Sequence, residues 1–300
     1  MRHFSINSFD GTPIFVRVWD DVLEPKGVVQ IAHGMCEHSG RYDEFASFLE
    51  KNGYIVFADD HRCYGQTENI DDIGYHQGEI FEDTLSDLIF LNKRFQQEYS
   101  LPVVLFGHSY GSFLSQAFLE RGCKVNGVIL AGTAYMGKAL PFLGYVFASL
   151  LPKKLKPAFI LKMSDLLFDG AYKPERGPSL WTSSDAEKRK AYLADPMCNI
   201  PPSVNFYYNM MKGLLSVAKK SNLEKIDADT PVAIFSGRAD PIGGAKSSKA
   251  KSLYNLLRDR GVKKVRLFIY ENARHELVNE KQRDTYMRHM LSFIDYCFDS

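Results

Sequence analysis

The sequence predicts an α/β protein with a mostly parallel sheet of eight strands, helices on both faces and a helical cap insertion. Short β-branched and apolar runs alternate with amphipathic stretches of helical length, as a parallel sheet buried on both faces requires. This alternation stops in the middle of the chain and resumes before its end. The 300 residues, of which 45% are hydrophobic and 24% charged, are enough for one substantial core.

The chain opens with two apolar runs that predict an antiparallel hairpin at one edge of the sheet. They cover residues 4–8 and 13–19, and the turn dipeptide Asp10-Gly11 lies between them. Later runs predict strands at residues 28–32, 54–58, 103–106, 125–131, 232–236 and 264–270. The amphipathic stretches predict helices at residues 41–52, 83–98, 112–121, 245–260 and 276–298.

Residues 134–219 interrupt this alternation. Eight prolines punctuate mostly helical-looking pieces there: Pro141, Pro152, Pro157, Pro174, Pro178, Pro196, Pro201 and Pro202. Between Ala134 and Leu215 eleven Lys and Arg stand against six Asp and Glu, so this part carries +5 and the rest of the chain −4. No internal repeat appears in the sequence. We therefore expect a core of residues 1–133 and 220–300, and a helical cap of residues 134–219.

Composition narrows the class of partner and the compartment. The formal net charge of +1 offers no basic field for nucleic acid, so a small substrate or a lipid is expected. The five cysteines are scattered without a CxxC pair, which favours reduced thiols over a disulfide framework or a zinc site. The N-terminus turns polar at once and favours a cytoplasmic protein. No pattern indicates an oligomeric state.

A candidate nucleophile, Ser109, lies in the Gly-His-Ser-Tyr-Gly pentapeptide of residues 107–111. The pentapeptide follows a predicted apolar strand and precedes a stretch compatible with a helix. In such a strand-turn-helix setting a tight turn exposes the serine hydroxyl, and the two glycines make that turn sterically possible. Chance could supply the pentapeptide alone, but its position between a buried strand and a helix favours a nucleophilic serine.

The two partners that such a serine needs follow in the expected order. Asp240 comes after the predicted strand at residues 232–236, and His275 after the one at residues 264–270. Both positions fall at the carboxyl ends of parallel strands, where open α/β sheets place their sites. Taken alone, they could be a turn aspartate and a helix-capping histidine. Together with Ser109 they predict an acyl-enzyme mechanism, with His275 as general base and acid and Asp240 orienting its ring.

The developing oxyanion needs hydrogen-bond donors in fixed positions. One expected donor is the backbone N–H of Tyr110, the residue after the nucleophile. The other is the backbone N–H of Met35, in the loop after the strand at residues 28–32, where Gly34 lets the backbone turn toward the substrate. This mechanism requires neither a metal nor an organic cofactor, so none is expected.

Five sequence blocks, at residues 32–42, 59–62, 107–111, 237–241 and 274–276, resemble a known family. It is the monoacylglycerol lipase and lysophospholipase branch of the α/β-hydrolases, also described as serine aminopeptidase S33-like or Hydrolase_4. The most specific part is the segment at residues 33–42, because it contains the run Glu-His-Ser-Gly-Arg-Tyr. The resemblance implies the α/β-hydrolase fold, the triad of Ser109, Asp240 and His275, and oxyanion amides at Met35 and Tyr110.

The resemblance also implies hydrolysis of a single acyl ester, with a monoacylglycerol or a lysophospholipid as the leading substrates. A generic short-chain carboxylesterase is the nearest alternative. An aminopeptidase-like peptidase is disfavoured because the cap is net basic, whereas a substrate ammonium requires acidic groups. A non-catalytic binding protein is disfavoured because every expected catalytic group is present. The candidate substrate-binding residues are His33, Gly34, His108, Phe142 and Phe147.

The beginning of the cap suggests a contact with lipid. Residues 139–151, which include Phe142 and Phe147, are apolar and are followed by Lys153, Lys154 and Lys156. An apolar patch beside cations suits transient contact with a membrane or micelle, although residues 139–152 are too few to span a bilayer. The alternative is a helix packed on its own domain with solvated lysines. The expected protein is therefore cytoplasmic and peripheral to the membrane at most.

Overall fold

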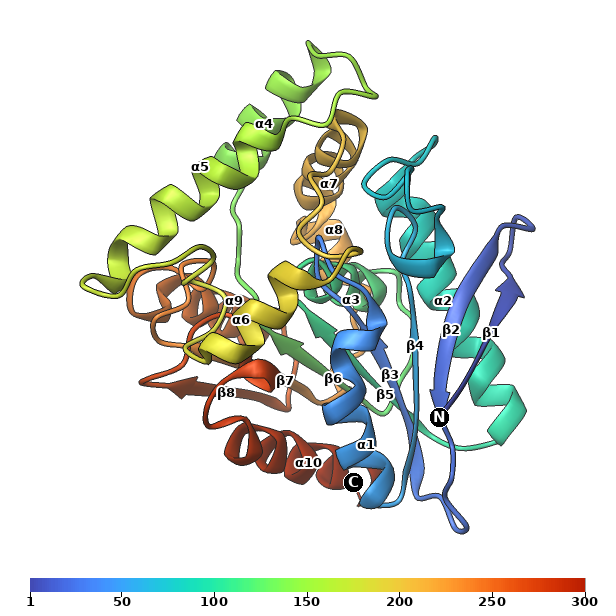
Figure 1. The fold of residues 1–300 in the computed structure, drawn as a ribbon. Helices are drawn as coiled ribbons and strands as arrows, with labels where there is room; N and C mark the ends of the chain where they lie inside the picture. Colours follow the sequence, from blue (N-terminus) through green and yellow to red (C-terminus); the bar gives the residue numbers. More distant parts are fainter. Residues whose placement is uncertain (300) are drawn as a thin grey trace.

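One sheet of eight strands runs through the computed structural model, which describes residues 1–299 (Figure 1). Its strand order is β1-β2-β4-β3-β5-β6-β7-β8. The strands are β1 (Arg2–Asn7), β2 (Pro13–Trp19), β3 (Gly27–Ala32), β4 (Tyr54–Asp59), β5 (Val103–His108), β6 (Gly127–Ala131), β7 (Val232–Gly237) and β8 (Val265–Tyr270). β1 pairs antiparallel with β2 and β2 with β4, and all other neighbours are parallel. The mostly parallel sheet and its antiparallel edge hairpin are thus confirmed.

Helices cover both faces of this sheet. They are α1 (Asp43–Lys51) and α10 (Arg283–Asp299) on one face, and α2 (Ile80–Tyr99), α3 (Tyr110–Glu120) and α9 (Ser248–Asp259) on the other. Side chains of a strand point alternately to opposite faces, so β5 sends Val104 and Phe106 toward the first layer and Leu105 toward the second. Every residue of β5 is buried, which explains why its sequence is a continuous apolar run.

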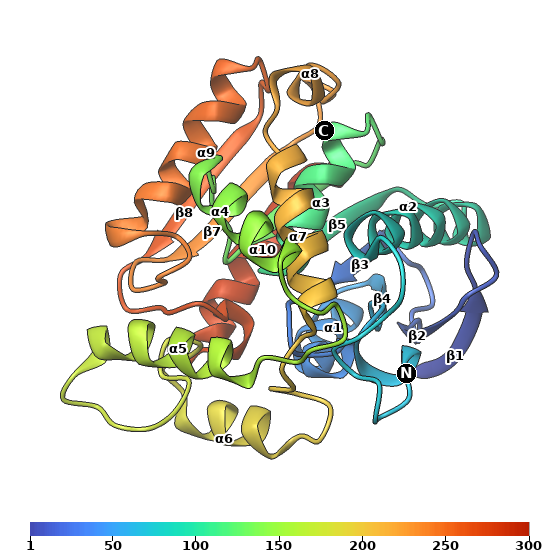
Figure 2. The same cartoon turned by 90° about the horizontal axis from the view of Figure 1, so that it is seen from above.

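Four further helices lie beyond the carboxyl ends of the parallel strands, within the segment that the sequence assigns to a cap (Figure 1). They are α4 (Ala139–Ser149), α5 (Ala158–Asp169), α6 (Ala186–Ala194) and α7 (Val204–Ser216), and the short α8 (Lys220–Leu223) follows. Seen from above, α4 and α7 lie over the centre of the molecule and α5 and α6 lie to one side (Figure 2). α7 packs against both α4 and α2. No helix in the described residues has the length and apolar character needed to cross a bilayer.

Two helices begin three or more residues later than the sequence pattern predicts. α10 begins at Arg283 rather than at residue 276. The side chain of Glu280 accepts the backbone N–H groups of Arg274 and Ser184, which holds the chain before α10 in an irregular course. α9 begins at Ser248 because the two residues before it have positive φ angles of 53° and 58°. Tertiary contacts before α10 and left-handed backbone before α9 thus outweigh helix propensity.

Candidate active site

Ser109 lies in the sharp turn between β5 and α3. Its φ of 50° and ψ of −115° place it in a region that residues other than glycine rarely adopt. Two glycines make room for this turn. A side chain at Gly107 would collide with Ser115 in α3, and one at Gly111 would collide with the backbone carbonyl of Ala32 at the end of β3. The turn presents Ser109 to a cavity above the sheet.

Asp240 and His275 meet beside this turn, after β7 and β8. The ring nitrogen Nδ1 of His275 lies 3.0 Å from Oδ2 of Asp240, and both side chains are buried. The other carboxylate oxygen accepts the backbone N–H of Ile242 at 2.8 Å, which fixes the orientation of Asp240. Because a carboxylate can only accept, Nδ1 carries the proton and Nε2 is the basic nitrogen. His275 lines the same cavity as Ser109.

The pKa of His275 is raised above its ordinary value. Burial alone would lower this pKa, but the charge and hydrogen bond of Asp240, helped by the charges of Glu276 and Glu37, outweigh it. The neighbouring His108 behaves in the opposite way, because burial and the proximity of His275 lower its pKa to about 3. His108 is therefore neutral near physiological pH, and His275 is the ring of this pair that can exchange a proton there.

We expect kcat/KM to fall on the acid side with a midpoint above the ordinary imidazole value of about 6.5. Only neutral His275 can accept a proton from Ser109, so activity rises as pH passes upward through the raised pKa of His275. Glu276→Gln removes a negative charge that raises this pKa, so the midpoint should move to lower pH.

Initial rates on a soluble p-nitrophenyl ester, measured across the range in which imidazoles titrate, locate this midpoint. Glu271→Gln is the matched control, since Glu271 is exposed and pairs with Arg238. An unchanged midpoint or one at higher pH in Glu276→Gln would contradict this account of the pKa.

Two side chains fix the loop that carries Met35. His33 Nδ1 donates to the carbonyl oxygen of Gly34 at 2.7 Å, and the carboxylate of Glu37 accepts the Gly34 N–H at 2.6 Å. The Gly34 C=O and the Met35 N–H belong to one trans peptide, so they point in opposite directions. The hydrogen bond from His33 to this C=O therefore directs the Met35 N–H away from His33. Within residues 1–299, the backbone N–H groups of Met35 and Tyr110 donate to no protein acceptor. Both residues line the cavity, where an oxyanion could accept from these groups.

Arg41 joins this loop to the loop of His275. Its guanidinium donates to Glu37 through Nη1. It also donates to Glu276 through Nη1 at 3.1 Å and through Nη2 at 2.6 Å. The three charged side chains are at most 9% exposed. Burial would raise the pKa of Glu276, but Arg41 lowers it to about 2, so this carboxylate is ionised. The network links two loops of the site. It also gives a structural reason for the Glu-His-Ser-Gly-Arg-Tyr run, because the Glu and the Arg of this run belong to the network.

A cavity of about 400 Å³ opens above Ser109. Apolar side chains from α3, α4 and α7 form much of its wall: Phe113, Leu140, Phe147, Ala148, Met210, Met211 and Leu214. Carboxylates also line it, namely Glu37, Asp165 and Glu276. The cavity thus has room for an acyl chain along the α4 and α7 helices and for polar groups near His275.

Most site residues expected from the sequence meet at this cavity. Those that line it are Gly34, Met35, His108, Ser109, Tyr110, Phe147 and His275. Asp240 lies behind His275, and two residues expected to bind substrate lie elsewhere. His33 is buried, and its ring stacks on that of His61 and accepts the backbone N–H of His61. The ring thus holds the oxyanion loop instead of facing the cavity. Phe142 lies on the outer face of α4 and is 55% exposed. It is five residues from Phe147, a spacing that places the two side chains on different sides of an α-helix.

Sequence reasoning missed the contribution of the cap to the site. The ring of Trp181 lies 4.9 Å from that of His275, and its indole N–H donates to Asp165 at 2.9 Å. The ring of Tyr192 packs under Arg41 at 4.6 Å. The one signal for Trp181 is its rarity, because the chain has two tryptophans. No sequence motif surrounds Asp165 or Tyr192.

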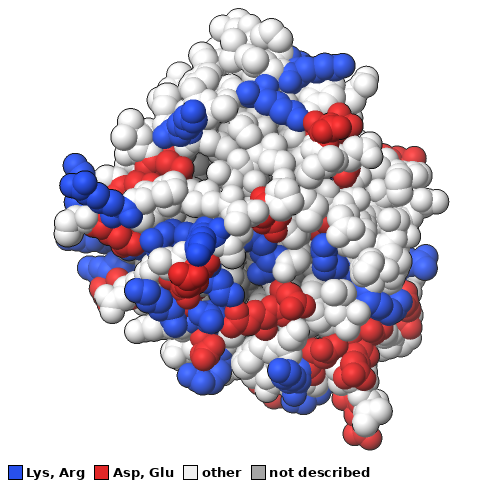
Figure 3. All heavy atoms as spheres, viewed as in Figure 1, with Lys and Arg blue, Asp and Glu red and all other residues white. Residues whose placement is uncertain are grey.

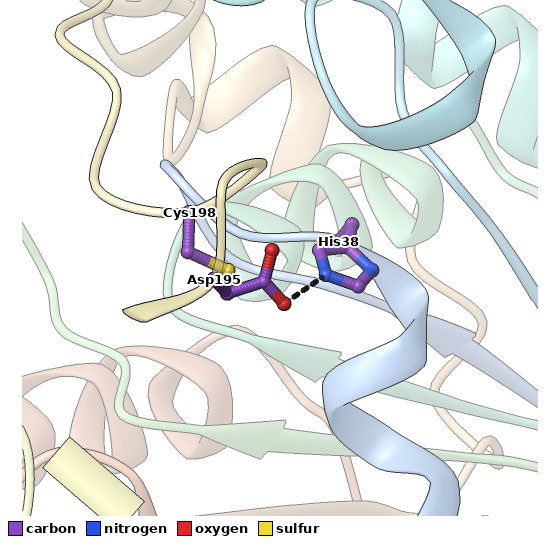
Figure 4. Close-up of side chains that lie close together, drawn as sticks. All are labelled: His38, Asp195 and Cys198. Atoms are coloured by element: carbon purple, nitrogen blue, oxygen red, sulfur yellow. Dashed lines mark hydrogen bonds and ion pairs between the residues drawn. The ribbon is translucent and has the colours of Figure 1, made fainter. Parts of the chain in front are cut away.

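His38, Asp195 and Cys198 form a further contact between the oxyanion loop and the connection after α6 (Figure 4). Theirs is the one group with metal-ligand spacing among residues 1–299, with ligand atoms within 4.8 Å of one another. His38 Nδ1 accepts the Gly40 N–H at 3.2 Å, so the proton is on Nε2, which donates to Asp195 at 2.9 Å. A metal at Nε2 would require the opposite tautomer. In this tautomer the cluster joins the connection after α6 to the loop of His38 through a hydrogen bond.

The fold and the geometry of this site define a serine hydrolase of the α/β-hydrolase class. The chain belongs to the Hydrolase_4 family of serine aminopeptidases, S33, whose model matches residues 23–282. This match confirms the family that the sequence blocks resemble.

Curated relatives and a solved structure agree with this assignment. The chain is 28% identical to a monoglyceride lipase of Rattus norvegicus over 274 residues, which cover 90% of this chain and 82% of the relative. It is 27% identical to a monoglyceride lipase homolog of Monkeypox virus over 279 residues, or 91% and 90% of the two chains. A thermostable carboxyl esterase from Bacillus coagulans has a similar fold, with a TM-score of 0.86 at 25% identity over 99% of this chain and 98% of the other. The chain is thus a serine ester hydrolase.

Proposed function

We propose that the chain hydrolyses monoacylglycerols through an acyl-enzyme on Ser109. The observation that carries this proposal is the cavity, whose apolar wall leads from α4 and α7 to Ser109 and His275. Such a wall suits one long acyl chain better than the short acyl groups of a generic esterase. The similarity to monoglyceride lipases over about nine-tenths of the chain supports the same substrate class.

The proposed reaction begins when the Ser109 hydroxyl attacks the ester carbonyl and His275 Nε2 takes its proton. The N–H groups of Met35 and Tyr110 stabilise the oxyanion of the tetrahedral intermediate. Protonated His275, held by Asp240, then gives its proton to the departing glycerol oxygen, which leaves the acyl group on Ser109. A water molecule, deprotonated by His275, releases the fatty acid and restores the serine.

A substrate panel tests this proposal. We expect kcat/KM for monoacylglycerols to rise with chain length as the acyl group fills the apolar part of the cavity, and to exceed that for short p-nitrophenyl esters. A preference for acetyl and butyryl esters would indicate a short-chain carboxylesterase instead. Hydrolysis of aminoacyl amides as fast as long-chain monoacylglycerols would indicate the peptidase alternative and contradict the proposal.

We further propose that the cap contacts lipid aggregates through the outer faces of α4 and α5. The exposed apolar residues of these helices and of the C-cap of α4 are Leu140, Phe142, Leu143, Val146, Phe147, Leu150, Phe159, Met163, Leu166 and Leu167, of which Leu140 and Phe147 also line the cavity. Figure 3 shows the top of the molecule, over α4, as a largely uncharged surface flanked by Lys and Arg. An exposed apolar surface of this kind beside cations suits reversible binding to a lipid surface. Docking there would bring the cap side of the cavity to its substrate.

Phe142→Ser should lower hydrolysis of long-chain monoacylglycerols in vesicles by about tenfold and leave hydrolysis of a soluble short-chain ester unchanged. Phe142 is 55% exposed and does not line the cavity, so its loss affects only docking. Phe147→Ser is the matched comparison, because Phe147 is 54% exposed and also lines the cavity. That variant should lose activity on long chains even in detergent solution. Equal losses on vesicles and on the soluble ester for Phe142→Ser would rule out docking through α4.

A further inference from the structure

Of the three carboxylates that line the cavity among the described residues, Asp165 is the one without a Lys or Arg partner. No Lys or Arg is among the described residues that line the cavity. Glu37 and Glu276 share the guanidinium of Arg41, which offsets one of their two charges. The carboxylate of Asp165 accepts instead from two neutral donors, the indole N–H of Trp181 at 2.9 Å and the hydroxyl of Ser179 at 3.3 Å. The Asp165 carboxylate therefore faces the cavity without a cationic partner in the described residues.

Asp165 is linked through Trp181 to the ring of His275, beside which the alcohol would leave. Trp181 connects it to the reaction centre, because the same indole that donates to Asp165 packs against the ring of His275. His275 protonates the leaving oxygen in the proposed mechanism, so the leaving group must lie beside this ring. The acyl chain would then contact the apolar residues of α3, α4 and α7 that line the cavity.

We infer that Asp165 selects the leaving group by charge, so that the enzyme accepts neutral glycerol monoesters and rejects esters whose leaving group bears a phosphate. This inference rests on the proposed function and concerns the choice between monoacylglycerols and lysophospholipids that the sequence leaves open. Glycerol hydroxyls can donate to the Asp165 carboxylate, whereas the oxygens of a fully ionised phosphate can only accept. At a separation of about 6 Å and the effective dielectric constant of a protein site, repulsion between two single charges amounts to a factor on the order of 100 in kcat/KM.

The test uses the full chain and four substrates with one common acyl chain, each in mixed micelles of a neutral detergent. One pair is the monoacylglycerol and its glycerol 3-phosphate analogue. The other pair is the 4-nitrophenyl ester and the 4-carboxyphenyl ester, which differ in the charge of an aryl leaving group. Within each pair, the ratio of the kcat/KM values is compared between wild type and variants, so the intrinsic reactivity of each ester cancels.

Asp165→Asn should raise the relative kcat/KM of the anionic member of both pairs on the order of 100-fold, because the repelling charge is gone. Asp165→Glu keeps the charge and should keep the wild-type ratios. Asp169→Asn is the matched control: Asp169 lies one turn later in α5 and binds the backbone N–H of Trp181, but does not line the cavity. It too should keep the wild-type ratios.

Wild-type ratios in Asp165→Asn would overturn the inference, as would an equal change in Asp169→Asn. Failure of the proposed function would look different. A wild-type enzyme that cleaves the aryl esters and neither glycerol ester would refute monoacylglycerol hydrolysis, while the aryl pair would still report whether Asp165 filters charge.

Discussion

Asp240→Asn should lower kcat about 10⁴-fold while the protein stays folded. The carboxylate holds the proton of His275 on Nδ1 and so leaves Nε2 free to accept the proton of Ser109. An asparagine can present its amide N–H to Nδ1 and stabilise the tautomer in which Nε2 is already protonated. The amide oxygen can still accept the backbone N–H of Ile242, so the turn after β7 keeps its shape. The acid limb of the pH profile should also move to lower pH, since Asp240 raises the pKa of His275.

Steady-state kinetics on a soluble ester, with a thermal melt to verify folding, measure this effect. Asp229→Asn is the control, because Asp229 pairs with Lys263 on the surface. A loss of less than about tenfold in folded Asp240→Asn would mean that another group orients His275.

Arg41→Met should lower the free energy of unfolding by about 3–5 kcal/mol, because it leaves two buried carboxylates without their shared cation. It should also slow catalysis, since Glu37 holds the Gly34 N–H of the oxyanion loop and Glu276 is next to His275. Urea unfolding of wild type and variant measures the first effect, and kcat on a soluble ester measures the second.

Arg121→Met removes an exposed ion pair with Glu82 and should cost about 1 kcal/mol or less. The triple variant Arg41→Met, Glu37→Gln, Glu276→Gln removes all three charges and should regain part of the lost stability, but not the lost activity. If Arg41→Met cost no more than Arg121→Met, the network would not hold the two loops together.

The fold could be predicted because its signals are local. The central parallel strands β5, β6 and β7 are short, mostly apolar runs between amphipathic stretches, and burial on both faces demands such runs. The positions of Ser109, Asp240 and His275 follow from this order, since each comes shortly after the end of a parallel strand. The starts of α9 and α10 were predicted less well, because tertiary contacts of Glu280 and left-handed backbone before Ser248 decide them.

The rest of the site depends on contacts between distant segments, which no local pattern records. Arg41 and Glu276 are separated by 235 positions in the chain, and Trp181 reaches His275 from the middle of the cap. His33 was expected to bind substrate because it borders the oxyanion loop, yet its ring holds that loop from behind. Phe142 and Phe147 share an apolar run, but helical geometry gives them different faces of α4.

Labelling of the folded chain with a fluorophosphonate tests the central claim most directly, because only an activated serine hydroxyl attacks this reagent readily. We predict that one equivalent reacts, that peptide mass spectrometry finds it on Ser109, and that esterase activity is lost in parallel with labelling. His275→Ala should abolish the rapid reaction, since Nε2 of this ring takes the serine proton. Rapid labelling of another residue, or full esterase activity after stoichiometric labelling of Ser109, would contradict the assignment of Ser109 as the nucleophile.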